Sequence, residues 1–545
     1  MRRALYGCGA LAVLGVALLA TSPSATGERS SGRATAPTVY VSPSGSDKGS
    51  CSQASPCLTI DKAYHVASPG AVVQLAEGTY PTQTLRPDDS KTGGADVVIG
   101  PAPGATVRVA GFVTGNDKTG AGAKHFELRG VQVGSLVRLS RGAEDVTLRD
   151  IDAIGIDFTS ARDVRVLGGD FGPLVDGVSH INACGVPGCF PSEGILIDGA
   201  TFHDYTISNP APHSECLLVW PARKLTIRNS TFRNCTDFDV LVKPYNTRLV
   251  GLPGDIVFEN NVFDEPIVGD GCLCQRGGNA IAITQGEGEA WSSVTIRYNS
   301  ALGGFRVDPA ITNATVEGNI GRKDQRTSCQ SNVSFSHNVW SGTTCSGSDR
   351  RAGFSAVFVA GNSTTFDLRL LRKSPAIAGG DPERAPRTDI VGAWRPTTFP
   401  PDVGAYQREP AMAAAGKQIG STTLGKSRND VADVYGTAIG RSPVKLPSGR
   451  WGRLARYLVP GGRVSVLFVD DRAAEISTTS RLYRTAHGVA VGEPFRSRLQ
   501  ASSGATCVRS ARGLFVRPSR SASPVVAELI VVPRNAVPQC AVPKR

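Results

Sequence analysis

The feature that most constrains the fold is a six-residue phrase that recurs eight times between about residue 145 and residue 340. The copies begin at Val146, Val164, Ile195, Leu225, Ile256, Val294, Ala314 and Val333. The first and third residues of each copy are apolar and the second and fourth are mostly polar, which is the alternation of a strand with one buried face. Successive copies start 18 to 38 residues apart. Such spacing predicts one solenoid coil per phrase, with the extra residues looping out.

The fifth and sixth positions of the phrase predict a turn and a polar ladder. The fifth residue is Gly, Asn or Asp in six of the eight copies, and Tyr298 and His337 are the exceptions. Gly, Asn and Asp tolerate a left-handed backbone and therefore suit a sharp turn. The sixth position holds an asparagine in four copies, at Asn261, Asn299, Asn319 and Asn338. If the coils stack, each of these amides can bond to the next coil.

The phrase resembles the coils of right-handed parallel β-helix proteins of the pectate-lyase-like superfamily, in its secreted bacterial form. An opening segment at 39–80 and a closing segment at 366–406 resemble the two ends of the same proteins, with a short amphipathic helix plugging the first coil. The resemblance covers about residues 38–407. It implies an all-β, right-handed, single-stranded parallel β-helix. It does not imply one activity, because this fold hosts lyases, hydrolases, epimerases, esterases and non-enzymatic adhesins.

Composition divides the chain into four predicted segments. Residues 1–37 are predicted as a signal peptide with a flexible N-terminal segment, because Arg2 and Arg3 precede an apolar stretch from Leu11 to Ala20. Residues 38–410 are predicted as the β-helix and 411–423 as a linker. Residues 424–545 are predicted as a small basic α+β domain, and the chain is predicted to be secreted or associated with the cell envelope.

The predicted C-terminal domain differs from the β-helix in charge and in pattern. Residues 411–545 carry a net charge of +14, whereas 38–410 carry about −5. A helix at 424–436, opened by Ser427, precedes strands near 463–471 and 474–476. A second helix followed by strands is predicted from residue 491. This tandem helix-then-strands order resembles small envelope modules of the β-lactamase-inhibitor-protein and outer-membrane-assembly lipoprotein type. Without a nucleic-acid motif, the basic charge predicts binding to anionic wall or envelope polymers rather than to nucleic acid.

The cysteines agree with export. Twelve cysteines remain once Cys8 is assigned to the removed peptide. Close pairs predict disulfides: Cys51/Cys57, Cys184/Cys189, Cys272/Cys274, Cys329/Cys345 and Cys507/Cys540. The further pair, Cys216 and Cys235, lies 19 residues apart and is predicted to cross neighbouring coils. The alternative, a metal site at Cys272 and Cys274, is weaker because no second close Cys or His pair has zinc-site spacing.

Polar residues predict a groove between the longest loops, at 171–220 and 262–292. In the related enzymes the substrate lies along one sheet, beside such loops. Taking 216–220, 239–243 and 280–284 as equivalent strands places Lys243 beside Trp220 and Thr284. The same alignment brings Glu215, Asp237 and Asp239 within about two coil steps of roughly 4.8 Å. Other polar groups predicted in this groove are Asp176, His180, His213 and Asn279.

Two chemistries fit this set of residues. Cleavage of a uronic-acid polymer by β-elimination would use Ca²⁺, held by Glu215, Asp237 and Asp239, with Lys243 as the base. Hydrolysis would use Asp239 and Glu215 as the carboxylate pair, with His213 assisting. Trp220 and Asn279 are the predicted substrate-binding residues. Each of these side chains also has a purely structural interpretation, such as holding a loop or ending a strand.

The sequence therefore predicts a secreted, carbohydrate-directed β-helix protein, expected to be a monomer. Lyase-type cleavage of an acidic polysaccharide is the favoured activity, with a non-catalytic glycan-binding or structural role as the alternative and a glycoside hydrolase as the third. The Asn-Thr-Asp, Gly-His-Gly and Arg-Ile-Lys set of polygalacturonases is absent. No dinucleotide or phosphate-binding loop occurs.

Overall fold

A computed structural model describes residues 37–115, 122–208, 215–264, 278–286, 290–322, 329–397, 399–495, 507–519, 524–536, 538 and 540. The predicted signal peptide, His213, Cys272 and Cys274 lie outside the described residues. No helix among the described residues is both long enough and apolar enough to span a membrane.

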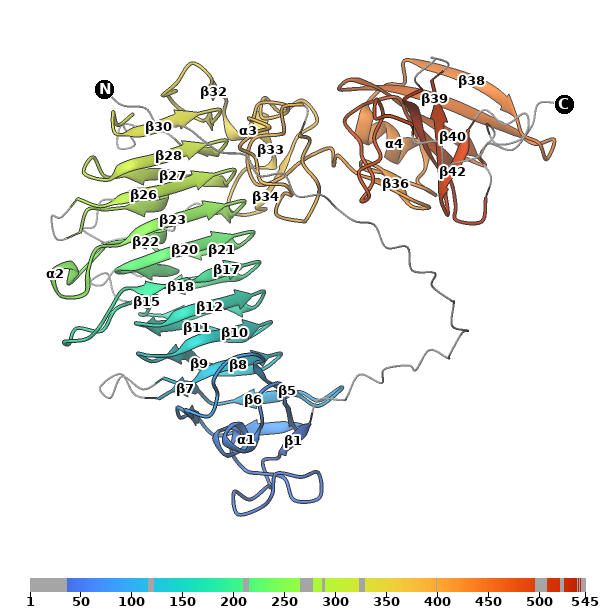
Figure 1. The fold of residues 1–545 in the computed structure, drawn as a ribbon. Helices are drawn as coiled ribbons and strands as arrows, with labels where there is room; N and C mark the ends of the chain where they lie inside the picture. The colour runs from blue at the N-terminus through green and yellow to red at the C-terminus, as the bar shows by residue number, and fades with distance from the viewer. Residues whose placement is uncertain are drawn as a thin grey trace, which may run out of the picture. The chain divides into compact units, whose positions relative to one another are not determined.

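The first part of the chain is a right-handed parallel β-helix, as predicted (Figure 1). One face is a parallel sheet of 13 strands that contains every copy of the phrase. Its strands are β1 (Thr38–Val41), β2 (Val72–Leu75), β5 (Val97–Pro101), β8 (Lys124–Arg129), β10 (Glu144–Arg149), β12 (Arg162–Leu167), β16 (Ser192–Glu193), β17 (Leu196–Asp198), β20 (Ala222–Arg228), β23 (Gly254–Glu259), β26 (Ser292–Arg297), β28 (Thr312–Glu317) and β30 (Val333–Ser336).

The remaining strands of the β-helix pair in two further parallel ladders. The first runs through β3 (Gly78–Tyr80), β6 (Val107–Val109), β13 (Asp170–Phe171), β14 (Leu174–Val175), β18 (Thr201–Thr206), β21 (Thr231–Cys235), β24 (Val262–Phe263), β29 (Ile320–Arg322), β31 (Val339–Trp340) and β32 (Arg350–Arg351). The second runs through β4 (Gln83–Leu85), β7 (Phe112–Thr114), β15 (Ser179–Asn182), β19 (Leu217–Val219), β22 (Phe238–Val242) and β25 (Asn279–Ile283). The eight-residue strands β9 (Gln132–Leu139), β11 (Asp152–Thr159) and β27 (Ser300–Val307) take part in both ladders.

Stacking of equivalent residues builds the core. The residues at the third position of the phrase, such as Ile227 and Val316, are fully buried in seven of the eight copies, and Phe335 in the last copy is partly buried. The rings of Phe171, Phe202, Phe232 and Phe263 stack at centroid separations of 5.0, 5.1 and 5.1 Å. Stacked rings at this spacing match the distance between neighbouring strands.

Both polar predictions from the phrase are confirmed. All eight residues at its fifth position have a positive φ, including Tyr298 at 55° and His337 at 55°. The asparagines form a continuous buried ladder in which the backbone N–H and the side-chain NH₂ of one residue donate to the Oδ1 of the next: Asn261 to Asn299, Asn299 to Asn319 and Asn319 to Asn338. Asp349 accepts the last pair of bonds, so the ladder ends on a carboxylate.

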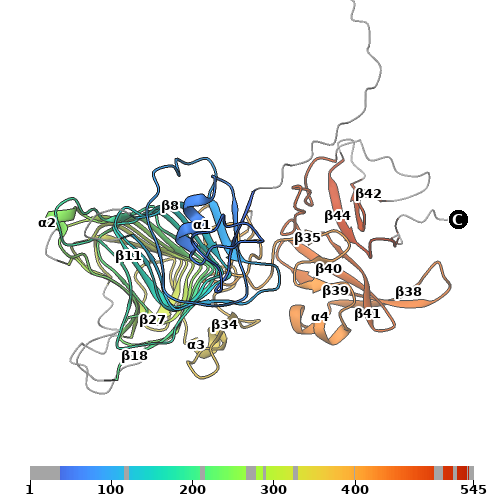
Figure 2. The same ribbon diagram turned by 90° about the horizontal axis from the view of Figure 1, so that it is seen from below.

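A helix covers the first coil of the β-helix, and a closing segment packs beside its last coils. Helix α1 (Ile60–Val66) starts at Thr59, whose side chain accepts a bond from the Lys62 N–H, and it buries Ile60, Ala63 and Tyr64 in the core. Viewed from below, the coils lie one behind another and α1 lies across the nearest of them (Figure 2). Beside the last coils, α3 (Phe354–Val357), β33 (Phe358–Ala360) and β34 (Asp367–Leu370) bury Val357, Phe358 and Leu368 against Val262 and Val339, in a cluster separate from the main core.

Five of the six predicted disulfides lie within the described residues, and all five form. They join Cys51 to Cys57, Cys184 to Cys189, Cys216 to Cys235, Cys329 to Cys345 and Cys507 to Cys540.

The C-terminal region is an antiparallel sheet with one helix. Its seven strands pair in the order β38 (Gly440–Lys445), β39 (Trp451–Val459), β40 (Gly462–Val469), β41 (Arg472–Thr478), β44 (Val526–Val531), β43 (Leu514–Pro518) and β42 (Val508–Ala511). Helix α4 (Arg428–Tyr435) has the predicted cap: Ser427 and Asp430 form a reciprocal capping box. The predicted second helix has no counterpart at 491–495, and its remainder lies outside the described residues.

The segment predicted as a linker contributes to this region. Residues 411–423 form β35 (Ala413–Ala414), β36 (Gln418–Ile419) and β37 (Thr422–Thr423), a small antiparallel sheet. Ala411, Ala413 and Ile419 are buried in the same core as the C-terminal strands. Apolar side chains in a Gly- and Ala-rich stretch are enough to bury it once a neighbouring core is present. The predicted domain boundaries stay a prediction.

Candidate functional site

The strand alignment predicted for the groove is confirmed. Leu217 of β19 pairs with Val240 of β22, which pairs with Ile281 of β25. The same register places Trp220, Lys243 and Thr284 at equivalent positions just after the three strands. The Lys243 N–H donates to the Val219 carbonyl, and the Thr284 N–H donates to the Val242 carbonyl, at 2.9 Å each.

A column of polar side chains leads up to this part of the ladder. Arg138 of β9 pairs with Asp157 of β11, and Asp157 pairs with His180 of β15. Side chains of paired residues in a parallel sheet project from the same face. The Asp157 carboxylate lies 3.7 Å from Arg138 Nε and accepts a 3.2 Å bond from the Asn182 side chain. One carboxylate thus has a cation and an amide on its two sides.

An aromatic strip continues from His180 along the same face. The Trp220 ring lies edge-on to the His180 ring at a centroid separation of 5.8 Å, and it lies 5.5 Å from the Tyr245 ring. Tyr245 is 49% exposed. Leu218, Leu241 and Ala282 form a small apolar cluster beside these rings. Exposed rings next to polar groups are suited to stacking against the apolar face of a sugar.

His180 is the titratable group best suited to accept a proton here. Burial lowers the pKa of its imidazole, and the nearby Asp157 and Glu215 carboxylates oppose that shift. The ordinary histidine value is about 6.5. A lowered value keeps the ring neutral at pH 7, and a neutral ring with its second nitrogen free to accept can act as a general base.

Asp239, a predicted site residue, lies below the surface. Its side chain is fully buried, and neither carboxylate oxygen has a hydrogen-bond partner among the described residues. Burial raises the pKa of Asp239 well above its ordinary value, and Asp264 raises it further. Both effects favour the protonated acid, because desolvation and a nearby like charge each penalise the carboxylate.

The other predicted site residues differ in how deeply they are buried. Glu215 is fully buried near His180, and Asn279, at the start of β25, is buried with Oδ1 unbonded among the described residues. Asp237 is half-buried with a φ of 63°, and Lys243 is exposed. His213 lies outside the described residues. The Ca²⁺ ligand set of Glu215, Asp237 and Asp239 is not among the groups of three whose ligand atoms approach within 4.8 Å in the described part of the chain.

Three residues of this face were missed in the sequence. Asp157, Asn182 and Tyr245 carry no motif, and Asp157 lies 23 residues before His180. A weak signal was present, because Asp157 is the polar residue between the apolar Ile156 and Phe158 of one strand. The pairing of Asp157 with His180 on the next coil could be predicted only by knowing how many residues the intervening turn contains.

Comparison with known proteins adds little about activity. No family model matches the chain, and no curated protein matches it. A rhamnogalacturonan lyase is 13% identical with a TM-score of 0.35, over 59% of this chain and 91% of that one. XylC in complex with xylose is 9% identical with a TM-score of 0.37, over 68% and 98%. A family 28 exopolygalacturonase of Yersinia enterocolitica is 12% identical with a TM-score of 0.25, over 56% and 65%. Likeness at this level carries no argument about chemistry.

Proposed function

We propose that the face formed by β15, β19, β22 and β25 binds an acidic polysaccharide and that the protein cleaves it by β-elimination. The observation that carries this proposal is the position of His180. It is half-buried beside Asp157 and Glu215, and its ring touches the Trp220 indole. A general base next to an aromatic ring, on a face that extends over several strands, is suited to binding and cleaving a polymer of sugars.

Substrate binding follows from the side chains that remain accessible. Trp220 and Tyr245 supply stacking surfaces, and the exposed Lys243 supplies a positive charge next to Trp220. His180 and Lys243 are two strands apart, which corresponds to roughly 10 Å along the coil axis. A chain lying along this axis would therefore meet the base and the cation at neighbouring sugars. An anionic polymer fits the cation better than a neutral one.

The chemical step needs a base and a group that offsets the substrate carboxylate. His180 takes the proton from the carbon next to the uronate carboxylate, and the released electron pair forms a carbon–carbon double bond. The bond from the neighbouring carbon to the glycosidic oxygen breaks, and that oxygen takes up a proton. We assign to Lys243 the contact with the carboxylate, a role that the sequence had given to Ca²⁺. The Asp157 and Glu215 carboxylates favour the imidazolium that forms when His180 takes the proton.

The test is a screen of the purified protein on acidic polysaccharides, with and without Ca²⁺, for unsaturated products that absorb in the ultraviolet. We expect His180→Gln to lower kcat by about 100-fold or more, and Lys243→Ala mainly to raise KM. His203→Gln is the matched control, because His203 is also a partly exposed histidine near two carboxylates, here Asp170 and Asp204, but it lies on β18. Wild-type turnover in both site variants would remove these residues from the mechanism. Binding without any product would favour the non-catalytic alternative.

We further propose that the protein is exported and that its basic C-terminal region binds anionic wall or envelope polymers. Five disulfides support an oxidising compartment. Arg441, Lys445 and Arg453 lie exposed on the neighbouring strands β38 and β39. These cations provide a surface on which a negatively charged polymer could bind.

A further inference from the structure

Two groups of three side chains in the described part of the chain could each present metal ligands. Within each group, one ligand atom per residue lies within 4.8 Å of the others. One group is Asp96, His125 and Asp145, and the other is Glu317, His337 and Asp381. Both lie away from the face that carries His180, because His125, Asp145 and Glu317 lie on the 13-stranded sheet, Asp96 and His337 lie beside its strands, and Asp381 lies in the closing segment.

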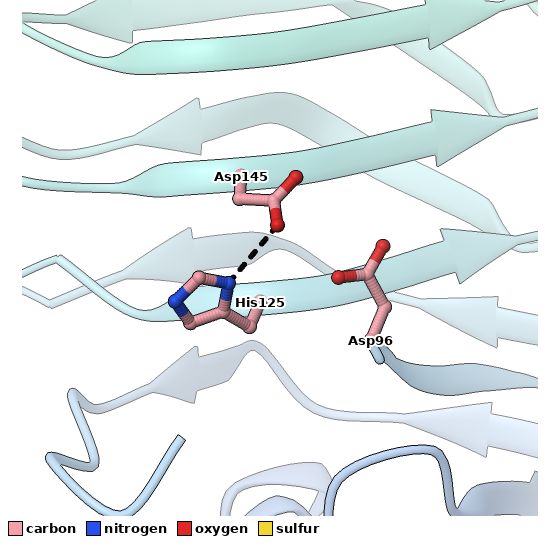
Figure 3. Close-up of side chains that lie close together, drawn as sticks. All are labelled: Asp96, His125 and Asp145. Atoms are coloured by element: carbon pink, nitrogen blue, oxygen red, sulfur yellow. Dashed lines mark hydrogen bonds and ion pairs between the residues drawn. The ribbon is translucent and has the colours of Figure 1, made fainter. Parts of the chain in front are cut away.

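The first group is already satisfied by its neighbours. Figure 3 shows the His125 ring directed at the Asp145 carboxylate, and His125 Nδ1 lies 3.0 Å from Asp145 Oδ2. Arg165 Nη2 lies 3.0 Å from Asp145 Oδ1 and 4.0 Å from Asp96 Oδ2. All three side chains are partly exposed. The guanidinium therefore occupies the position that a cation would take.

The second group contains buried polar atoms without partners. Glu317 is 3% exposed, and its Oε2 accepts a 3.0 Å bond from Arg384. Its Oε1 is buried and has no hydrogen-bond partner among the described residues, and the same is true of His337 Nδ1. Unpaired buried polar atoms are costly, so each requires an explanation. Burial also raises the pKa of Glu317, and Asp381 adds to that shift.

The three side chains come from segments that are distant in sequence. Glu317 ends β28, and His337 occupies the left-handed turn after β30. Asp381 belongs to the closing segment, where its carbonyl accepts a 2.9 Å bond from the Tyr298 hydroxyl. A ligand held by all three would tie the closing segment to two successive coils.

We propose that Glu317, His337 and Asp381 bind a zinc ion that fastens the closing segment to the last coils of the β-helix. One imidazole nitrogen and two carboxylate oxygens are ordinary zinc ligands, and water completes the site. Such ligands lie about 2.0 to 2.2 Å from the metal, so the three side chains must draw together by small rotations. Arg384 offsets only one of the two carboxylates and keeps its bond to Oε2, while Oε1 is left to the metal.

The experiment uses the full chain without a polyhistidine tag, treated with a chelator and titrated with Zn²⁺ alone. We expect one ion per chain, a higher midpoint of thermal unfolding with zinc, and visible absorption bands when Co²⁺ replaces Zn²⁺. His337→Asn is the main variant, because Asn229 and Asn260 hold the same left-handed position in other coils at φ of 51° and 55°. It should lower zinc affinity at least tenfold, which corresponds to about 1.4 kcal/mol.

The matched control is His125→Asn, which makes the same substitution at another left-handed position, with φ of 52°. This variant should bind zinc as the unmodified chain does. Absence of zinc binding, or equal affinity in the unmodified chain and His337→Asn, would overturn the proposal. If His337→Asn does not fold, Asp381→Asn replaces it, because Asp381 is partly exposed and an Asn side chain keeps an oxygen that can accept the Glu383 N–H bond. None of these readouts depends on the activity proposed for the other face.

Discussion

The β-helix and the C-terminal sheet bury polar groups in different ways. In the β-helix, parallel stacking brings the same position of successive coils together, so each asparagine of the ladder meets another asparagine. In the C-terminal region, segments outside the sheet bring unlike residues together. A single carboxylate, Glu409 just before β35, accepts bonds from the hydroxyls of Tyr435 of α4 and of Tyr483, which follows β41, at 3.0 and 2.6 Å.

The difference shows how a repeated residue can satisfy its own buried polar groups, whereas an unrepeated residue needs partners of other types. An amide both donates and accepts, so one residue type can satisfy itself along a stack without any charge. A carboxylate only accepts when ionised, and Glu409 has one buried oxygen, Oε2, without a partner among the described residues. Burial raises the pKa of Glu409, and bonds from Tyr483, Ser421 and Tyr435 oppose the shift. The bonds between the asparagines therefore do not depend on pH, whereas the bonds to Glu409 do.

The two regions also differ in their surface charges. Cations on the 13-stranded sheet are paired across coils: Lys124 with Glu144 and Lys224 with Glu193 at 2.7 Å each, and Arg228 with Asp198 at 2.8 Å. Arg441, Lys445 and Arg453 have no carboxylate within 4 Å in the part of the chain that the structure describes. Stacked coils allow opposite charges to alternate, whereas the C-terminal region has too few acids to do so.

The largest expected effect comes from breaking the amide ladder. Asn299→Ala removes the acceptor of two Asn261 donors and the donor to the Phe258 carbonyl. Leaving these groups buried and unpaired should lower the free energy of unfolding by roughly 2 to 4 kcal/mol. Urea denaturation measures the change. The control is Thr295→Ala, which shortens a partly exposed side chain four residues before Asn299 and should cost at most about 0.5 kcal/mol. An equal loss in both variants would refute the role of the ladder.

The second expected effect separates the two regions by pH. A raised pKa means that folded Glu409 keeps its proton to higher pH than unfolded Glu409, whose value is about 4.3. Its contribution to stability is therefore present below that value and is lost as pH rises through the folded value. Each unit of difference corresponds to about 1.4 kcal/mol. Unfolding free energies measured from pH 4 to 8 should fall more steeply in the unmodified chain than in Glu409→Gln, and parallel pH profiles would contradict this assignment.

The smallest expected effect concerns the exposed cations. Replacing Arg441, Lys445 and Arg453 together by Gln should weaken retention of the full chain on an anionic polymer column several-fold at 0.1 M salt. The matched triple variant replaces the paired Lys124, Lys224 and Arg228 by Gln and should change retention less, since their charges are already compensated. At 1 M salt the difference should vanish, because the Debye length falls from about 10 Å to about 3 Å. Equal losses in the two variants would show that net charge alone governs binding.

Much of the fold could be predicted from the sequence because the information is local. The alternation, the turn residue and the asparagine recur within six residues. Taking 216–220 and 239–243 as equivalent strands predicted the register that places Lys243 next to Trp220. The Ser427 cap of α4 and the pairing of close cysteines are also local features. The strands at 413–423 carry no such local signal, because their burial depends on a core contributed by strands that follow them.

The candidate site is the part that only the tertiary structure decided. His180 was recognised as a groove residue, but its partner Asp157 depends on the turn between β11 and β15, whose length no pattern specifies. The sequence predicted that Asp239 would be a metal ligand or an acid, and the chain alone could not show that it is fully buried beside Asp264. Short-range backbone preferences and alternation are properties of the chain itself. The pKa and the neighbours of a side chain depend on burial and on contacts between coils, which exist only once the chain has folded.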